Sequence, residues 1–330
     1  MKRIVFSGFI SVIITAGLLC AACPDNDNTG TSADEPELHV YIAFGQSNMQ
    51  GPATIRDQDK TGIDYSRWQT LNVVADKYAG VNRAKGQWYD AAPPLIIPDS
   101  ALPYWLDGSF TTGLGPTDYF GRTLVEGTKE NITIGVIAVA NGDLALASFH
   151  KTQGAIYFDS TAGNGSNGKE SGRPSGTERQ GWTRYTTAGY TSLYDAIISN
   201  VKIAQEQGGI VKGIIVHQGE SGRGLTYTSW QEMLKEIYDD MLSDLGLKPN
   251  SIPILLGQTW NGGSGLTGDY LNIDNRIQTI IPKARIISSE GCNEGRTGTN
   301  QPDGIHFGSA DMETFGTRYG KKMLALVYGK

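Results

Sequence analysis

The sequence predicts an α/β fold in which a parallel sheet is covered by helices on both faces. The clearest observation is the unbroken β-branched run 132–140, which lacks polar alternation, as a strand buried on both faces requires. Such runs alternate with segments of helical apolar spacing, the pattern of strand–helix–strand units with right-handed crossovers. The 330 residues, 39% of them hydrophobic, show no internal repeat and no second core, so we expect one large domain.

The expected elements follow one another from residue 38 to the end of the chain. Strands are predicted at 38–44, 71–74, 132–140, 211–216, 252–256 and 284–288. Helices are predicted at 113–125, 193–204, 230–245, 270–281 and 311–327. The proline-rich segment 91–104 excludes a regular helix or a central strand. The segment 151–181 is rich in Gly, Ser and Asn, so it is expected to form a loop.

The N-terminus indicates export. A basic pair, an apolar run from Ile4 to Leu19 and small residues before a cysteine resemble a bacterial lipoprotein signal. We therefore expect a signal peptide at 1–22, a lipid on Cys23, a polar tether at 23–37 and the folded domain at 38–330. Cys20 is the other candidate for lipidation, and an ordinary cleaved signal or a transmembrane anchor would also explain the pattern. Lipidation predicts a protein held at the outer membrane or cell surface, and its absence a periplasmic or secreted one.

Composition excludes several classes of partner. The net charge is −6 and no Lys/Arg cluster provides a basic stripe, so nucleic acid is not expected as a partner. No HExxH pattern or cysteine cluster occurs, so neither a metal nor another cofactor is expected. After the signal, Cys292 is the remaining thiol and cannot form an internal disulfide. The sequence does not indicate the oligomeric state.

The first candidate for chemistry is a serine in the segment 45–51, directly after the first predicted strand. Gly45-Gln46-Ser47-Asn48 places Ser47 on a tight strand-to-helix turn, with backbone N–H groups at a helix start beside it. Nucleophilic serine catalysis needs such an exposed hydroxyl with donors nearby. The alternative is a plain loop in which Ser47 caps the next segment.

Three further polar segments follow predicted strands or lie near the C-terminus. They are Asn141-Gly142-Asp143, His217-Gln218-Gly219-Glu220 and Asp303-Gly304-Ile305-His306-Phe307. The carboxyl ends of parallel strands meet at one edge, where such folds bind ligands. Asp303 and His306 are spaced so that the carboxylate reaches Nδ1 and leaves Nε2 to take a proton from serine. The alternatives are an Asp/His helix cap at 303–306 and structural roles for His39, His150 and His217.

Together these segments resemble the SGNH/GDSL hydrolase superfamily, and most closely its sialate O-acetylesterase-like branch with carbohydrate esterase family six, the acetyl xylan esterases. The resemblance covers nearly all of the chain after the signal. It implies a three-layer α/β/α sandwich with a flavodoxin-like parallel sheet. It also implies Ser47 as nucleophile, His306 as general base and then acid, and Asp303 as the residue that orients the imidazole. Glu220 is a second acidic candidate; alternatively it holds the turn at Gln218.

The same resemblance implies an oxyanion hole formed by the N–H groups of Ser47 and Gly142 and the side-chain amide of Gln218. The chain departs from the family pattern in two places. Asn141-Gly142-Asp143 stands where paired glycines and a small hydroxyl residue are usual, which weakens the assignment of Gly142. Gln218 stands where the wider superfamily has asparagine, which fits this branch.

The implied reaction is removal of O-acetyl groups from carbohydrate through an acetyl-serine intermediate. Acetylated xylan, another glycan and O-acetylated sialic acid all remain open as substrates. Four aromatic residues are candidates for stacking on sugar rings, although for each one taken singly loop packing is the preferred explanation: Trp88, Tyr104, Trp182 and Trp260. The competing hypothesis is a surface lipoprotein that binds glycan without cleaving it, which would have no use for the Asp303–His306 pair.

Overall fold

The structure is a computed structural model of the whole chain. It describes residues 35–78, 81–96, 112–142, 144–154, 184–220, 227–259, 273–292 and 305–330. The predicted signal peptide, the tether up to residue 34 and most of the loop 151–181 lie outside these ranges, so export and lipid attachment at Cys23 stay predictions. Asp303, Asp143, Tyr104, Trp182 and Trp260 also lie outside them.

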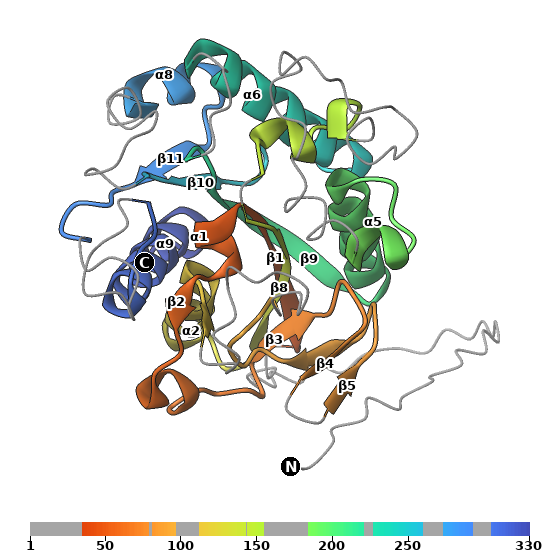
Figure 1. The fold of residues 1–330 in the computed structure, drawn as a ribbon, viewed down its shortest axis with the longest axis vertical. Helices are drawn as coiled ribbons and strands as arrows, with labels where there is room; N and C mark the ends of the chain where they lie inside the picture. Colours follow the sequence, from red (N-terminus) through yellow and green to blue (C-terminus); the bar gives the residue numbers. More distant parts are fainter. Residues whose placement is uncertain are drawn as a thin grey trace, which may run out of the picture. The chain divides into compact units, whose positions relative to one another are not determined.

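One seven-stranded sheet organises the described residues (Figure 1), with strand order β11-β10-β9-β1-β8-β3-β6. Its strands are β1 (Glu37–Gly45), β3 (Trp68–Leu71), β6 (Trp88–Asp90), β8 (Ile132–Ala140), β9 (Gly209–His217), β10 (Ile254–Gly257) and β11 (Ala284–Ile287). All neighbouring strands run parallel except the edge pair β3 and β6. The predicted parallel sheet is therefore confirmed for six strands, and the antiparallel β6 at one edge was not predicted.

Helices cover both faces of this sheet, because alternate residues of the central strand point to opposite sides. Val40, Ile42 and Phe44 pack in the core beneath α5 (Leu193–Glu206), α6 (Tyr227–Asp244) and α8 (Ile273–Ile280). Tyr41 and Ala43 pack in the core beneath α2 (Pro116–Gly127) and α9 (Ser309–Tyr328). Figure 1 shows the two helical layers on either side of the sheet, which confirms the three-layer prediction.

Helices α2 and α9 lie very close together because α9 carries glycine where they meet. A Cβ atom at Gly316 would lie 2.4 Å from the carbonyl oxygen of Pro116, and one at Gly320 would lie 2.5 Å from Cβ of Thr123. Any side chain at these two positions would push the helices apart. This contact fixes α9, which begins three residues after His306.

The region between residues 51 and 115 differs most from the prediction. The strand expected at 71–74 was misplaced, since β3 ends at Leu71, and the antiparallel β6 was missed. The rest of the described part of this region holds five short elements: β2 (Ala53–Thr54), η1 (Asp57–Lys60), β4 (Asp76–Tyr78), β5 (Val81–Arg83) and β7 (Thr112–Leu114). Two other short elements lie outside this region, α1 (Ser47–Gln50) before it and η2 (Leu146–Phe149) after it. These elements are too short to carry a detectable apolar period. Within the described residues, the helices are too short or too polar to cross a membrane.

Trp88 packs against the sheet. Its ring lies so close to β8 that a Cβ at Gly135 would come within 2.7 Å of it, and its indole N–H donates to Oε1 of Gln207 at 2.6 Å. Gly135 is the fourth residue of β8, far from the carboxyl end where the candidate site lies. Packing therefore explains Trp88 without a sugar.

Strand register brings three of the polar segments to one point. Gly45, the last residue of β1, pairs with Ala140 of β8 on one side and with His217 of β9 on the other. The chain therefore leaves three adjacent strands at the same level, and the segments that follow them begin side by side.

Candidate active site

Ser47 begins a helical turn directly after the central strand, as predicted. β1 ends at Gly45 and α1 runs from Ser47 to Gln50. The turn needs glycine at position 45, because a Cβ there would lie 2.0 Å from the carbonyl oxygen of His217. The backbone N–H of Gln46 donates to that same carbonyl at 3.1 Å, which ties the turn to the end of β9.

Ser47 and His306 lie together although 259 positions separate them in the sequence. Nε2 of His306 is 2.9 Å from Oγ of Ser47, a hydrogen-bond distance. Ser47 is 3% exposed and His306 is half-buried. A hydroxyl within hydrogen-bond distance of an imidazole is the arrangement in which histidine removes the proton from a serine nucleophile.

Asn48, for which the sequence predicted no role, contacts the backbone on both sides of His306. Its Nδ2 donates to the carbonyl oxygen of Ile305 at 2.9 Å, and its Oδ1 accepts the N–H of Phe307 at 3.2 Å. The same Nδ2 also donates to Oε1 of Glu220 at 2.5 Å. Its place directly after the serine was the available signal, but the sequence does not reveal which segment such a side chain would contact.

Glu220 lies at this edge in a buried pair with His217. Its Oε1 is 2.9 Å from Nε2 of His217, and both side chains are almost fully buried. Burial opposes ionisation of this carboxyl, but attraction to His217 and hydrogen bonds from His217 and Asn48 hold the pKa of Glu220 below its usual value. The His217 ring also packs edge-on against Phe307 and Phe315.

Gln218 is fixed by three partners. Its Nε2 donates to the carbonyl oxygen of Leu144 at 2.8 Å and to Oε1 of Gln46 at 3.3 Å. Its Oε1 accepts the indole N–H of Trp230 at 2.8 Å, which fixes which way the amide points. The Gln218 amide therefore lies at the carboxyl edge of the sheet in a single orientation. Its N–H groups already donate to Leu144 and Gln46.

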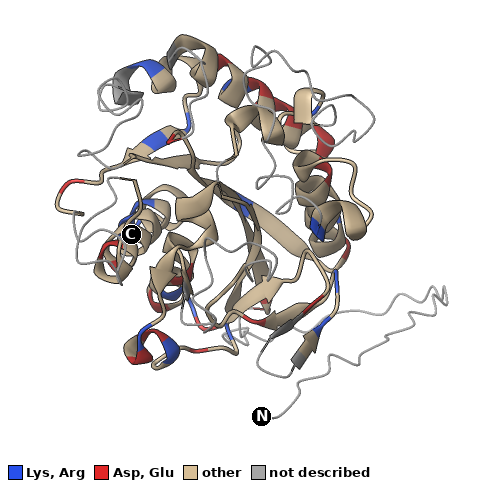
Figure 2. Ribbon diagram, viewed as in Figure 1, with Lys and Arg blue, Asp and Glu red and all other residues tan. Residues whose placement is uncertain are grey.

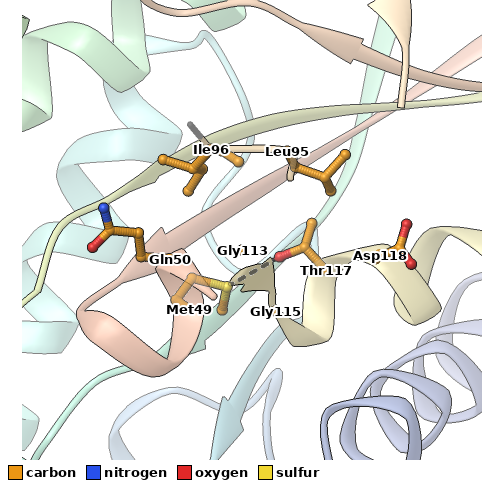
Figure 3. Close-up of a pocket in the computed structure, with 9 residues that line it drawn as sticks. Met49, Gln50, Leu95, Ile96, Gly113, Gly115, Thr117 and Asp118 are labelled. Atoms are coloured by element: carbon orange, nitrogen blue, oxygen red, sulfur yellow. Dashed lines mark hydrogen bonds between the residues drawn. The ribbon is translucent and has the colours of Figure 1, made fainter. Parts of the chain in front are cut away.

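The Gly142 N–H donates to Oε1 of Gln50 at 2.8 Å. Gln50 is buried and also lines a cavity of about 10 Å³ (Figure 3), together with Met49, Leu95, Ile96 and other residues of the α1–α2 junction. Such a volume holds about one water molecule. The cavity is therefore too small for a sugar or an acetyl group.

The two histidines outside this edge have structural partners. Nε2 of His39 lies 2.9 Å from Glu37 and its Nδ1 lies 2.7 Å from the hydroxyl of Tyr328. Nε2 of His150 lies 2.9 Å from Glu236. Across the described ranges, no three His, Cys, Asp or Glu side chains are grouped so that they could hold a metal ion.

Similarity to known proteins agrees with this geometry. A family model described as carbohydrate esterase, sialic acid-specific acetylesterase matches residues 37–163 and 173–325. This range includes Ser47, Gly142, Gln218, Glu220 and His306.

Three solved structures share the fold at 17% sequence identity. The crystal structure of NanS has a TM-score of 0.60, covering 90% of this chain and all of that one. A protein from Arabidopsis thaliana has a TM-score of 0.56, covering 88% and 99%. A carbohydrate acetylesterase from Xanthomonas citri has a TM-score of 0.52, covering 88% of this chain and 57% of that one. The family match spans most of the chain, so the protein belongs to the carbohydrate esterase, sialic acid-specific acetylesterase family and is a carbohydrate O-acetylesterase.

Proposed function

We propose that this esterase removes O-acetyl groups from a carbohydrate through an acetyl-enzyme formed on Ser47. The observation that carries the proposal is the 2.9 Å distance between Oγ of Ser47 and Nε2 of His306 at the carboxyl edge of the sheet. Asp303, three residues before the histidine, remains the proposed partner of Nδ1, on the spacing alone.

The reaction runs in two acyl transfers. Oγ of Ser47 attacks the acetyl carbonyl carbon while its proton passes to Nε2 of His306. The tetrahedral intermediate collapses, the bond to the sugar oxygen breaks, and His306 returns the proton to that oxygen. A water then gives a proton to His306 and attacks the acetyl-serine. When this second intermediate collapses, His306 returns the proton to Oγ of Ser47 and acetic acid leaves, which ionises to acetate.

The negative oxygen of each tetrahedral intermediate needs donors already in place. The proposed donors are the N–H groups of Ser47 and Gly142 and the amide of Gln218. Gln50 accepts from Gly142, and Leu144 and Gln46 accept from Gln218. We therefore propose that the oxyanion shares the Gln218 hydrogens, and that Gly142 contributes only when the Gln50 oxygen moves away.

The sugar itself remains open between O-acetylated sialic acid, acetylated xylan and another acetylated glycan. The family description supports sialic acid, whereas the Xanthomonas citri protein is described only as a carbohydrate acetylesterase. A panel of these three substrate types, with released acetate measured for each, decides between them. The preferred substrate is the one with the highest kcat/KM.

The nucleophile is tested with Ser47→Ala and p-nitrophenyl acetate. We expect kcat to fall at least about 10⁴-fold while the melting temperature stays near that of the wild type, because the hydroxyl makes the bond to the acyl group. Ser199→Ala, on helix α5, is the matched control and keeps wild-type activity. Equal rates for wild type and Ser47→Ala would refute the assignment, and a wild type that binds acetylated glycan without releasing acetate would favour the binding hypothesis.

A further inference from the structure

Asn48 occupies a position that controls where His306 lies. Its side chain is fully buried, and its two polar atoms contact the residues immediately before and after the histidine. Oδ1 accepts from Phe307 and Nδ2 donates to Ile305, so a single amide brackets residue 306. Because Asn48 follows Ser47 directly, this contact joins the backbone of the nucleophile to the backbone of the base.

The histidine needs such support. Residues 305–307 belong to no helix or strand in the part of the chain that the structure describes, and α9 begins only at Ser309. Side-chain contacts therefore replace the regular backbone ladder that holds a residue inside a strand or helix. Since a displacement of about 1 Å at a reacting group costs about a hundredfold in rate, holding this segment matters for catalysis.

Glu220 determines which way the Asn48 amide faces. A carboxylate accepts hydrogen bonds only, so Nδ2 must face Glu220 and Oδ1 must face the N–H of Phe307. His217 holds the same carboxylate oxygen at 2.9 Å from the end of β9. The other oxygen, Oε2, is buried and has no hydrogen-bond partner among the described residues, so the bonds of Glu220 are concentrated on Oε1.

We propose that Asn48 is a positioning residue for His306, and that Glu220 acts on catalysis through the Asn48 amide while His217 holds the carboxylate in place. The chain of contacts runs from His217 to Glu220, to Asn48, and to the backbone at 305 and 307. The inference rests on the proposed serine mechanism. It gives Glu220 a role that does not require contact with the imidazole of His306.

The first test replaces Asn48 by Ala and by Asp. Asn48→Ala removes all three bonds, and Asn48→Asp keeps the shape but loses both donations and places a second carboxylate beside Glu220. We expect kcat on p-nitrophenyl acetate to fall about a hundredfold or more in each, with KM within about twofold. Asn200→Ala is the control, because Asn200 is equally buried on α5 and makes two hydrogen bonds. Wild-type kcat in folded Asn48→Asp would overturn the proposal.

The second test separates Glu220 from a role as the acid partner of His306. In Glu220→Gln the amide oxygen still accepts from Asn48 and His217, so we expect kcat to fall less than about tenfold and the pH profile of kcat/KM to keep its shape. Amide replacement of a triad carboxylate costs about 10⁴-fold instead. A loss of that size in folded Glu220→Gln, with an altered pH profile, would overturn the proposal.

A double variant tests the contact itself. In Asn48→Asp/Glu220→Gln the amide has moved to position 220, where it can donate to the carboxylate at 48. We expect the double variant to recover at least about tenfold in kcat over Asn48→Asp alone, because residues in contact are not additive. Additive losses would overturn the proposed coupling. Ser47→Ala tests the nucleophile separately. If Ser47→Ala is inactive but the Asn48 variants keep the kcat of the wild type, the positioning role of Asn48 is refuted and the serine mechanism stands.

Discussion

Two buried clusters that contain carboxylates, one at the catalytic edge and one beside helix α2, differ in how their charge is held. The edge cluster is Asn48, His217 and Glu220. The flank cluster is Arg56, Asp59, Asp118, Tyr119 and Arg122. Figure 2 shows that η1 and α2 both carry acidic and basic residues. The edge cluster contacts the segment of His306, whereas the flank cluster joins η1 to α2 and, through Glu313, to α9.

Hydrogen bonds from two residues lower the pKa of a buried carboxyl more than a single nearby cation does. Asp59 is fully buried, yet hydrogen bonds from Arg56 and Tyr119 outweigh burial and hold its pKa below the usual value. Asp118 has Arg122 at 2.8 Å, but burial raises its pKa to about 7 in spite of that cation. Glu220 resembles Asp59, because His217 and Asn48 keep it ionised. In the edge cluster, therefore, the buried carboxyl of Glu220 is held ionised. In the flank cluster this holds for Asp59 but not for Asp118.

The largest effect is expected from Arg56→Ala, which leaves the buried Asp59 with Tyr119 as its remaining side-chain donor. Removing one partner of a buried ion pair costs about 3 kcal/mol, so we expect the free energy of unfolding in urea to fall by that amount. We expect kcat to stay within twofold, since the flank cluster does not contact Ser47 or His306. Lys60→Ala on the same turn is the control, because its pair with Asp57 is exposed and worth less than about 0.5 kcal/mol. If Arg56→Ala lowered kcat without lowering the free energy of unfolding, the flank cluster would act on catalysis, contrary to this prediction.

A smaller effect is expected from Asp118 and depends on pH. Its pKa is higher in the folded chain than in the unfolded chain, so between about pH 4 and pH 7 the folded state holds more protons. Stability from this group is present at low pH and is lost as pH rises, by up to about 1.4 kcal/mol per pH unit. Urea unfolding of Asp118→Asn at pH 5 and pH 7 measures this change. The variant should lose less stability over that interval than the wild type, and parallel curves would show that Asp118 is ionised throughout.

The smallest effect is expected at the acid end, from Glu220. Its folded-state pKa lies below the usual value of 4.5, so its stabilisation is present above that pH and is lost as pH falls through the folded value. Glu220→Gln should therefore give a flatter stability curve below pH 4.5 than the wild type, the opposite direction from Asp118. A steeper curve would mean that Glu220 is held protonated in the folded chain.

Much of the fold followed from pattern, and the failures have physical causes. The strand at 132–140 was predicted to the residue, because a run buried on both faces must be continuously apolar. The predicted 193–204 helix also formed, ending two residues later, at Glu206. Strands β3 and β6 were misplaced or missed because three or four residues show no period. Their positions depend on pairing, of β3 with β8 and of β6 with β3.

By itself the sequence determined the α/β class, the turn that carries Ser47, and the expectation that His306 would meet it, because strand periodicity and turn residues are local properties. Only the tertiary structure decided that Asn48 brackets His306, that Glu220 contacts Asn48 and His217, and that Gln50 engages Gly142. These contacts join segments up to 259 positions apart in the sequence. They depend on strand register and on the distance between α9 and the sheet, which no short stretch of sequence encodes.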